Sequence, residues 1–318
     1  MGKPNVRLNP TIEGGVNREL LARAIGLLQN ILPDVPQTQK RGKGRPGWNW
    51  QILLILSILM ALCKKTYSAY EAEMRTNETI QRLLGAAKLP SKSCLQRFQQ
   101  QLTIAYLRML LQRIALQYYQ LCADMFADAT GFTLNRVSSW FNLQLKRVTR
   151  KKDYYKLHII GLERWQLLFD FRITKGTRHD GPPLRHMLKP LTKIGLLLAD
   201  GAYACRATLK LILSKGGSPF LRFSKATTGN SKGCMQWGIQ FQFFKNWHSL
   251  WMHIYNQRSR VESIFSAIKR RYGDHLRGKS RRSRFRELIL RLIAYNLRQA
   301  LRIEYSFQHN LPLWVRAR

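Results

Sequence analysis

Short apolar runs in the middle of the chain constrain the fold most strongly. Each run is bounded by Gly, Pro or polar residues, which is typical of buried β-strands. The runs cover Met125–Gly131, Lys156–Gly161, Trp165–Thr174, Gly195–Gly201 and Pro219–Phe223. Helical patterns separate the last three runs, at Pro182–Leu191 and Arg206–Ser214. Three strands, a helix, a strand, a helix and a strand predict a mixed α/β sheet covered by helices.

The sequence before these runs has helical periodicity from about Trp48 to Leu121. Its most apolar stretch, Ile52–Cys63, is too short to span a bilayer and predicts a buried helix. Short helices with Lys92, Arg97 and Arg108 beside the last of them are typical of a helix-turn-helix unit that binds duplex DNA. A helical dimerisation domain is the alternative.

The charge of the chain points to a polyanionic partner. It contains 54 Lys and Arg against 17 Asp and Glu, a formal net charge of +37. Such an excess makes nucleic acid the expected partner, with an anionic membrane surface as the rival. The five cysteines are odd in number and form no CxxC pair, so no disulfide framework or zinc site is indicated and a reducing cytoplasm fits.

Basic residues also gather in two segments outside the regular elements. Lys43 and Arg45 belong to a Gly-Arg-Pro segment, a flat basic peptide of the kind that fits A/T-rich minor grooves. A solvated linker is the alternative for that segment. An Arg-rich run is expected to contact DNA backbone, or else to be a solvated basic loop, and its basic residues are Arg277, Lys279, Arg281, Arg282 and Arg284.

Two of the expected strands end on an aspartate followed by small residues, Asp128 and Asp200. A single aspartate after an apolar run is usually a turn former or a helix cap. Two of them at the edge of one sheet would repel each other unless a cation joined them, and hard divalent metal ions prefer oxygen ligands. The pair is therefore a candidate metal site.

A helix expected over Ile254–Arg271 carries the third candidate carboxylate. At 100° per residue, its side chains at Tyr255, Arg258, Glu262 and Lys269 fall within an arc of about 60°. One carboxylate among three groups that bind phosphate is suited to a metal-bound phosphodiester. The alternative is an exposed charged stripe with an Arg258–Glu262 ion pair, which contributes about 0.3 to 0.5 kcal/mol.

The spacing Tyr255-x2-Arg258-x3-Glu262-x6-Lys269 matches the Tyr-Arg-Glu-Lys signature of the DDE transposases encoded by bacterial and archaeal insertion sequences. Further blocks resemble that family's catalytic domain in order and spacing. They are Lys156-Leu-His158, Thr174–Asp180, Leu198–Tyr203 and Ala294–Leu297. The resemblance extends from about Met125 to Leu301.

The resemblance implies an RNase H-like catalytic domain in which Asp128, Asp200 and Glu262 hold two Mg²⁺ (or Mn²⁺) ions. It implies that Tyr255, Arg258 and Lys269 bind phosphates at the transposon end. The expected activity is cleavage at terminal inverted repeats and transfer of the 3′ ends to target DNA, by a homodimer in the synaptic complex. Double-stranded DNA is then the partner, no membrane is involved, and the protein is cytoplasmic and nucleoid-associated.

The resulting domain prediction has four parts: a basic arm or linker over residues 1–47, a helical DNA-binding domain over 48–121, an RNase H-like catalytic domain over 122–305 and a C-terminal tail over 306–318. Some relatives insert a large β-rich domain between the second Asp and the Glu. Here we expect at most a hairpin at about 216–247. Asp180 is expected to cap the helix that follows it, and His158 to pack near the site.

Two other functions remain open at this stage. One is a catalytically silent DNA-binding protein of transposase descent, and the other is an RNase H-like nuclease that cuts without strand transfer. The intact set of three acids favours a transposase over the silent protein.

Overall fold

A computed structural model describes residues 6–32, 47–133, 154–224 and 226–316. Lys43 and Arg45 lie outside these ranges. The chain divides into two compact units. The first comprises Met1–Ile114 and Arg286–Arg318, and the second comprises Ala115–Phe285.

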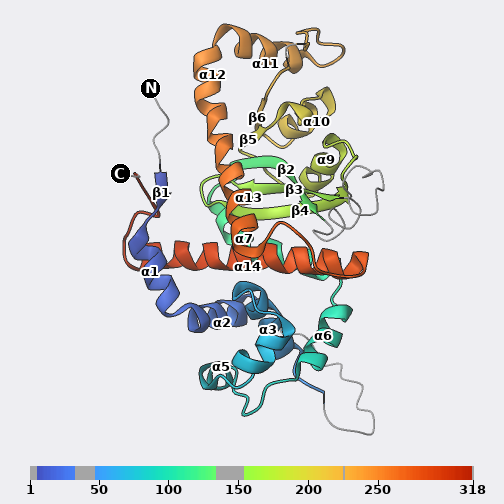
Figure 1. Cartoon of the computed structure of the whole chain (residues 1–318). Coiled ribbons are helices and arrows are strands. Elements are labelled where there is room, and N and C mark those ends of the chain that lie inside the picture. The colour runs from blue at the N-terminus through green and yellow to red at the C-terminus, as the bar shows by residue number, and fades with distance from the viewer. Residues whose placement is uncertain (1–5, 33–46, 134–153, 225, 317–318) are drawn as a thin grey trace, which may run out of the picture. The chain divides into compact units, whose positions relative to one another are not determined.

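The second unit is built on a five-stranded sheet with the order β4-β3-β2-β5-β6 (Figure 1). The strands β2, β3 and β4 pair antiparallel, whereas β2, β5 and β6 run parallel. Their bounds are β2 Met125–Thr133, β3 Tyr154–Leu162, β4 Leu167–Lys175, β5 Leu196–Ala199 and β6 Ser218–Leu221. The prediction of a mixed sheet in an α/β unit is confirmed, and this arrangement is consistent with an RNase H-like domain.

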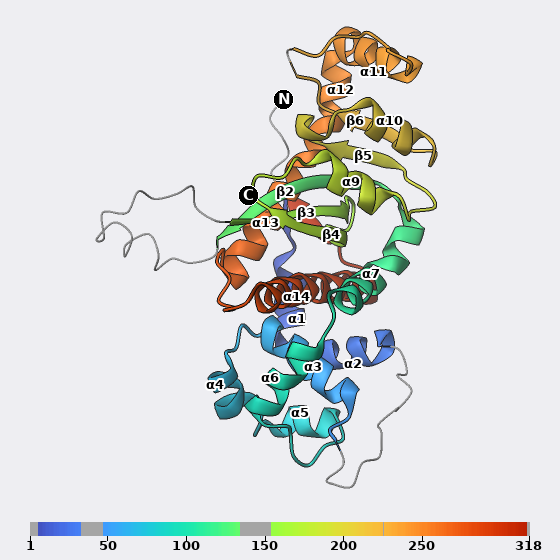
Figure 2. The ribbon, with the colours of Figure 1, turned by 90° about the vertical axis from the view of Figure 1, so that its right-hand side faces the viewer.

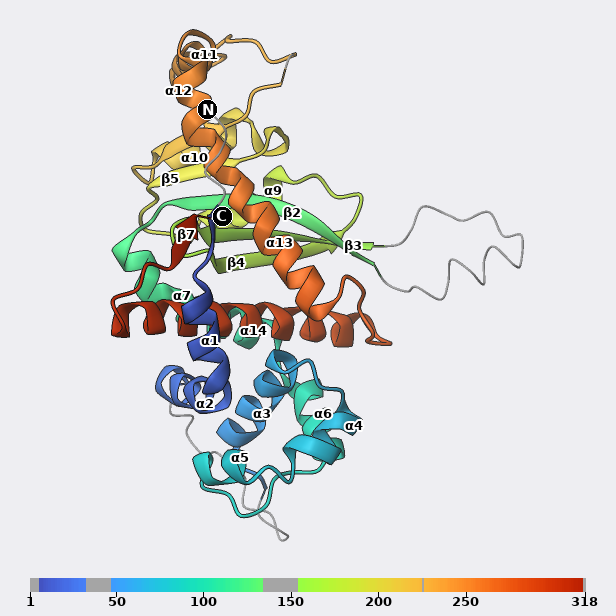
Figure 3. The same ribbon diagram turned by 60° about the vertical axis from the view of Figure 1, so that its left-hand side comes forward.

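Helices flank this sheet, as predicted. The helix α9 (Gly181–Leu188) packs on β3 and β4, and α10 (Arg206–Leu213) packs on β6. The helix α13 (Ser259–Tyr272) packs on β2 and crosses the sheet (Figure 3). The apolar residues of α13 are buried, so the helix edge that carries Glu262 is held beside β2.

The expectation of at most a hairpin over 216–247 is wrong. After β6 the chain forms two helices, α11 (Met235–Asn246) and α12 (His248–Tyr255). Phe223, just past β6, contacts the rings of Trp237, Phe241 and Phe244. Aromatic residues at these helical intervals pack α11 onto the end of the sheet. Aromatic residues have a high strand propensity, so the composition of this segment did not indicate a helix.

The first unit is helical, as predicted for residues 48–121. It also includes the helical residues 10–18 and 20–31, which lie in the segment predicted to be a basic arm or linker. Most of α7 and of α14 belongs to this unit, together with the antiparallel strands β1 and β7. The elements are β1 Val6–Leu8, α1 Pro10–Arg18, α2 Leu20–Ile31, α3 Trp50–Leu62, α4 Tyr67–Ala69, η1 Tyr70–Met74, α5 Glu78–Leu83, α6 Lys92–Gln101, α7 Ile104–Leu121, α14 Arg281–Gln308 and β7 Trp314–Arg316.

The apolar helix expected from Ile52 is α3, and its residues Leu53–Met60 are buried. In the described ranges, no single helix is long and apolar enough to cross a membrane. Two consecutive helical segments, Trp50–Leu62 and Tyr67–Met74, are together long and apolar enough to cross a membrane, but the chain bends by 116° between them.

Gly161 tests the packing of the central sheet. It lies at a register shift in β3, where an added Cβ would meet the Phe126 ring at 2.4 Å and the Leu167 backbone oxygen at 2.7 Å. Overpacking against backbone should make Gly161→Ala lose about 1 to 3 kcal/mol in the free energy of unfolding, measured with urea. Gly26→Ala, in α2 with nothing within 4 Å of the added Cβ, is the control and should be neutral or stabilising. Equal losses in both variants would contradict this packing.

Candidate active site

Asp128 and Asp200 lie side by side in the sheet. Ala127 and Ala199 form the last parallel pair between β2 and β5, and each aspartate is the next residue of its chain segment. Neighbouring strands are about 4.8 Å apart, so the two carboxylates share one edge of the site. Asp200 follows β5 directly, as predicted. Asp128 lies within β2 rather than at its end, because β2 stays paired with β3 as far as Thr133.

Arg258 joins Asp128 to the third candidate, Glu262. Its Nη1 donates to Asp128 Oδ2 at 2.9 Å, and its Nη2 donates to Glu262 Oε1 at 3.0 Å. The Arg258–Glu262 pair predicted as the structural alternative is therefore present, but the same guanidinium also binds the sheet carboxylate. The Arg258 and Asp128 side chains are only 16% and 18% exposed, so this pair is better shielded from water than an ordinary surface ion pair, whereas the Glu262 side chain is exposed.

The local electrostatics fit a cluster of carboxylates around one cation. Burial raises the pKa of Asp128, and the nearby charges of Asp200 and Glu262 raise it further. The Ala129 N–H and the Arg258 guanidinium oppose this shift. Burial lowers the pKa of Arg258, but its acidic neighbours outweigh burial and leave that pKa above its ordinary value. The site therefore favours added positive charge near Asp128.

Tyr255 and Lys269 lie on either side of this cluster, but not on one continuous helix. The predicted helix over Ile254–Arg271 is wrong in this respect, because α12 ends at Tyr255, a 3-10 turn covers Asn256–Arg258, and α13 begins at Ser259. Tyr255 is buried and stacks on Trp251, with ring centroids 4.8 Å apart. Trp251 and Tyr255 are four residues apart on α12, so this stacking is a contact within one helix that holds Tyr255 at the end of α12, next to the turn.

Lys269 reaches back to the strand that carries Asp128. Its Nζ donates to Thr130 Oγ1 at 2.6 Å and lies 5.5 Å from the centroid of the Phe132 ring. This contact fixes the C-terminal half of α13 beside β2. The ammonium group is thereby held two residues along the strand from the Asp128 carboxylate.

Behind the site, Asp180 does not have its predicted role. Its side chain makes no capping hydrogen bond to α9 and instead forms an ion pair with Lys156. His158 lies next to this pair, with Nδ1 3.7 Å from Asp180 Oδ1 and Nε2 2.9 Å from Thr174 Oγ1. His158 is opposite Ala129 in the register, so it lies on the other face of the sheet from Asp128. Asp180 stands at the N-cap position of α9, but its carboxylate pairs with the half-buried Lys156 instead of the helix terminus.

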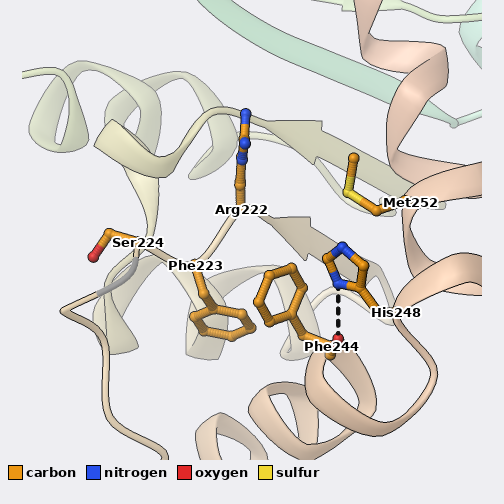
Figure 4. Close-up of a pocket in the computed structure, with 6 residues that line it drawn as sticks. All are labelled: Arg222, Phe223, Ser224, Phe244, His248 and Met252. Atoms are coloured by element: carbon orange, nitrogen blue, oxygen red, sulfur yellow. Dashed lines mark hydrogen bonds between the residues drawn. The ribbon is translucent and has the colours of Figure 1, made fainter.

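A nearby pocket of about 200 Å³ lies beyond the end of β6 (Figure 4). It is lined by Arg222, Phe223, Ser224, Phe244, His248 and Met252. Arg222 is the residue that the sequence reading missed. It follows Leu221, the partner of Ala199, and so continues the row of Asp128 and Asp200 onto a third strand. Its position, directly after the apolar residues of an expected strand, is the sequence feature that could have identified it.

The Arg-rich run follows α13. A hydrogen bond from Leu276 N to Thr133 O, at 3.1 Å, connects the start of this run to the end of β2. Arg277, Lys279, Arg281 and Arg282 are exposed. Arg284 differs from them, since its Nε donates to the Gly278 carbonyl oxygen at 2.7 Å and closes the turn. The exposed members leave a basic surface beside the strand that carries Asp128.

Asp128, Asp200 and Glu262 fit a divalent cation by donor chemistry, because carboxylate oxygens are the ligands that such ions prefer. In the described part of the chain, no group of three or more His, Cys, Asp or Glu side chains is arranged to hold a metal ion. The reason is visible in the contacts: Arg258 supplies the positive charge, and Glu262 points outward with 64% of its side chain exposed. Cation binding at all three carboxylates requires Arg258 to release at least one of them.

His158 gives the site region a pH-dependent stability. Burial lowers its pKa to about 4 from an ordinary 6.5. Between these values the unfolded chain binds a proton that the folded chain does not, so stability falls as pH is lowered through this window. Wild type should lose up to about 3 kcal/mol more than His158→Gln between pH 7 and pH 4, measured by urea unfolding. Parallel stability curves for the two proteins would contradict the buried neutral imidazole.

Comparison with known families concerns the part of the chain that carries these residues. A family model described as "Transposase DDE domain" matches residues 124–297, which is more than half of the chain. No curated protein and no solved structure matches the chain.

Proposed function

The chain belongs to the DDE transposase family, and we propose that it cleaves DNA at the terminal inverted repeats of a prokaryotic insertion sequence and joins the freed 3′ ends to target DNA. The supporting observation is the contact set of Arg258, which links Asp128 and Glu262 while Asp200 lies beside Asp128. These contacts support the proposal that three carboxylates from distant parts of the sequence act together at one edge of the sheet. The Tyr-Arg-Glu-Lys spacing supports the proposal that the chain belongs to that signature group.

The second unit is proposed to be an RNase H-like catalytic domain. Its sheet has three antiparallel strands followed by two parallel ones, with a helix after each of β4 and β5. The helical first unit is proposed to bind DNA. These two units replace the predicted bounds at 47, 121 and 305 in this proposal, because residues 1–114 and 286–318 belong to one unit and residues 115–285 to the other.

Asp128, Asp200 and Glu262 are proposed to hold the catalytic metal, two Mg²⁺ or Mn²⁺ ions. When bound, these ions supply Lewis-acid polarisation of the phosphodiester and a lowered pKa for the attacking water. The carboxylates fix the position of the cleavage site relative to the sheet. In cleavage, water forms a bond to phosphorus and the P–O3′ bond at the transposon end breaks, which frees the 3′-hydroxyl. In joining, that 3′ oxygen forms a bond to a target phosphorus, and the P–O3′ bond of the target strand breaks.

Arg258 is proposed to release the Asp128 and Glu262 carboxylates and to bind a DNA phosphate instead when DNA enters the site. Its planar fork, which here binds Asp128 and Glu262, has the geometry that binds two phosphate oxygens. Release from the carboxylates frees both N–H groups close to the site. Lys269 and Tyr255 are proposed to contact neighbouring phosphates from either end of the helix pair.

The charge of the rest of the chain supports DNA as the partner. With a net charge of +37, binding is expected to weaken steeply with salt as counterions are released from DNA. Lys43, Arg45 and the exposed basic residues Arg277, Lys279, Arg281 and Arg282 are proposed backbone contacts, with Arg284 shaping their loop. Pairing of two transposon ends is proposed to need a homodimer, and the protein is proposed to act at the nucleoid.

Substitution of the three acids tests the proposed chemistry. Asp128→Asn, Asp200→Asn and Glu262→Gln should each lower Mg²⁺-dependent cleavage and joining about 100-fold or more, because each removes a charged metal ligand while keeping its shape. DNA binding should survive in all three. The assay is a sequencing gel that resolves cut from joined products, on DNA carrying the ends that flank the gene.

Asp274→Asn is the matched control, since the Asp274 side chain is 47% exposed and lies outside the cluster. It should retain wild-type activity. Full activity in the three active-site variants would refute the proposal. Cleavage without joining would identify a nuclease instead, and DNA binding without either product in Mn²⁺ would identify a silent relative.

A further inference from the structure

The helix α6 presents a single polar face. At 100° per residue, Ser93, Gln96, Arg97 and Gln100 project within an arc of about 100°, and all four are exposed. The opposite side is apolar and buried through Leu95 and Phe98. α6 packs against α3 and α4 by that buried side, within the helical unit (Figure 2).

Within the described part of the chain, the polar side chains on this face make no contacts that would compete with a partner. In residues that the structure describes, no hydrogen bond or ion pair engages the side chains of Gln96, Arg97 or Gln100. Gln99, which lies toward the buried side, behaves differently, because its Oε1 accepts from Tyr67 Oη at 2.7 Å. The exposed amides and the guanidinium are therefore available donors and acceptors.

The helix itself is held in place at its N-terminus. Ser91 caps it by accepting from Cys94 N at 3.3 Å, and Glu71 Oε2 accepts from Lys92 N at 2.7 Å. Tyr70 Oη donates to the Pro90 carbonyl oxygen at 2.7 Å just before the helix. A fixed helix loses little entropy when its face docks on a ligand. Residues 84–91 separate it from α5, a longer connection than the three or four residues of a helix-turn-helix turn.

The charge around α6 matches a polyanion. Between Glu78 and Asp124 the sequence has no carboxylate but has six Lys and Arg. Ordinary solvated surfaces intersperse both signs of charge. A face of Gln, Arg and Ser with no acid is the set that hydrogen-bonds to base edges, since Arg pairs with guanine and Gln with adenine in the major groove.

We propose that α6 enters the major groove and reads base pairs of the transposon end, with Arg97 on guanine and Gln96 and Gln100 on adenine. Ser93 to Gln100 covers about 10 Å of helix, which matches about three base pairs. The inference rests on the proposed function for the identity of the duplex. It adds which helix recognises the sequence and by which residues.

The test is an in vitro selection with the full-length chain and a duplex library of 20 randomised base pairs. Wild type should enrich a motif that contains adjacent G and A positions. Gln96→Ala and Gln100→Ala should each lose the preference at one position, with affinity for the enriched duplex about 10- to 100-fold lower. Thermal unfolding should be unchanged, because the substituted side chains are exposed.

Arg97→Lys separates base reading from charge. It keeps the cation and should keep the salt dependence of binding, but it should lose the guanine preference because the fork is gone. Arg82→Ala is the control, an exposed basic residue of α5 in the same unit, and it should enrich the wild-type motif. Unchanged motifs in all the α6 variants, or no enrichment by wild type, would overturn the proposal.

This selection measures binding alone, so it separates the two claims. A chain that cuts and joins DNA while its α6 variants keep the wild-type motif refutes only the role of α6. A chain whose motif depends on α6 but which yields no product in Mg²⁺ or Mn²⁺ refutes only the transposase activity.

Discussion

The two ion pairs of Arg258 are the interaction on which the site depends. Asp128, Asp200 and Glu262 carry like charges that would repel at short range, and burial further disfavours the ionised form of Asp128. The guanidinium offsets this repulsion by binding Asp128 and Glu262 together. It therefore links the helix α13 to the strand β2 at the point where the chemistry is proposed to occur.

The sheet supplies the precision that this interaction needs. The register of β2 with β5 aligns Asp128 with Asp200, and the register of β5 with β6 adds Arg222 to the same row. A shift of one residue in either strand would turn an aspartate to the other face of the sheet. The contact of Lys269 with Thr130 fixes α13 along the same strand. Strand pairing thus sets the geometry, and Arg258 balances its charge.

Much of this arrangement could be predicted from the sequence, because the strands are short apolar runs with clear boundaries and Asp200 ends one of them. The turn over Asn256–Arg258 could not, since the residues there are compatible with a continuous helix. Asp180 was misassigned because its true partner, Lys156, is distant in sequence. The helix α11 was missed because aromatic residues have high strand propensity.

The central claim is that Asp128, Asp200 and Glu262 form one metal-binding site when DNA is bound. The most direct measurement is an anomalous difference map from crystals of the full chain grown with Mn²⁺ and a DNA end. The account predicts Mn²⁺ peaks between these three carboxylates, at oxygen distances of about 2.0 to 2.4 Å, with Arg258 turned to a phosphate. Peaks elsewhere, or an Arg258 that still bridges Asp128 and Glu262 in the DNA complex, would contradict it.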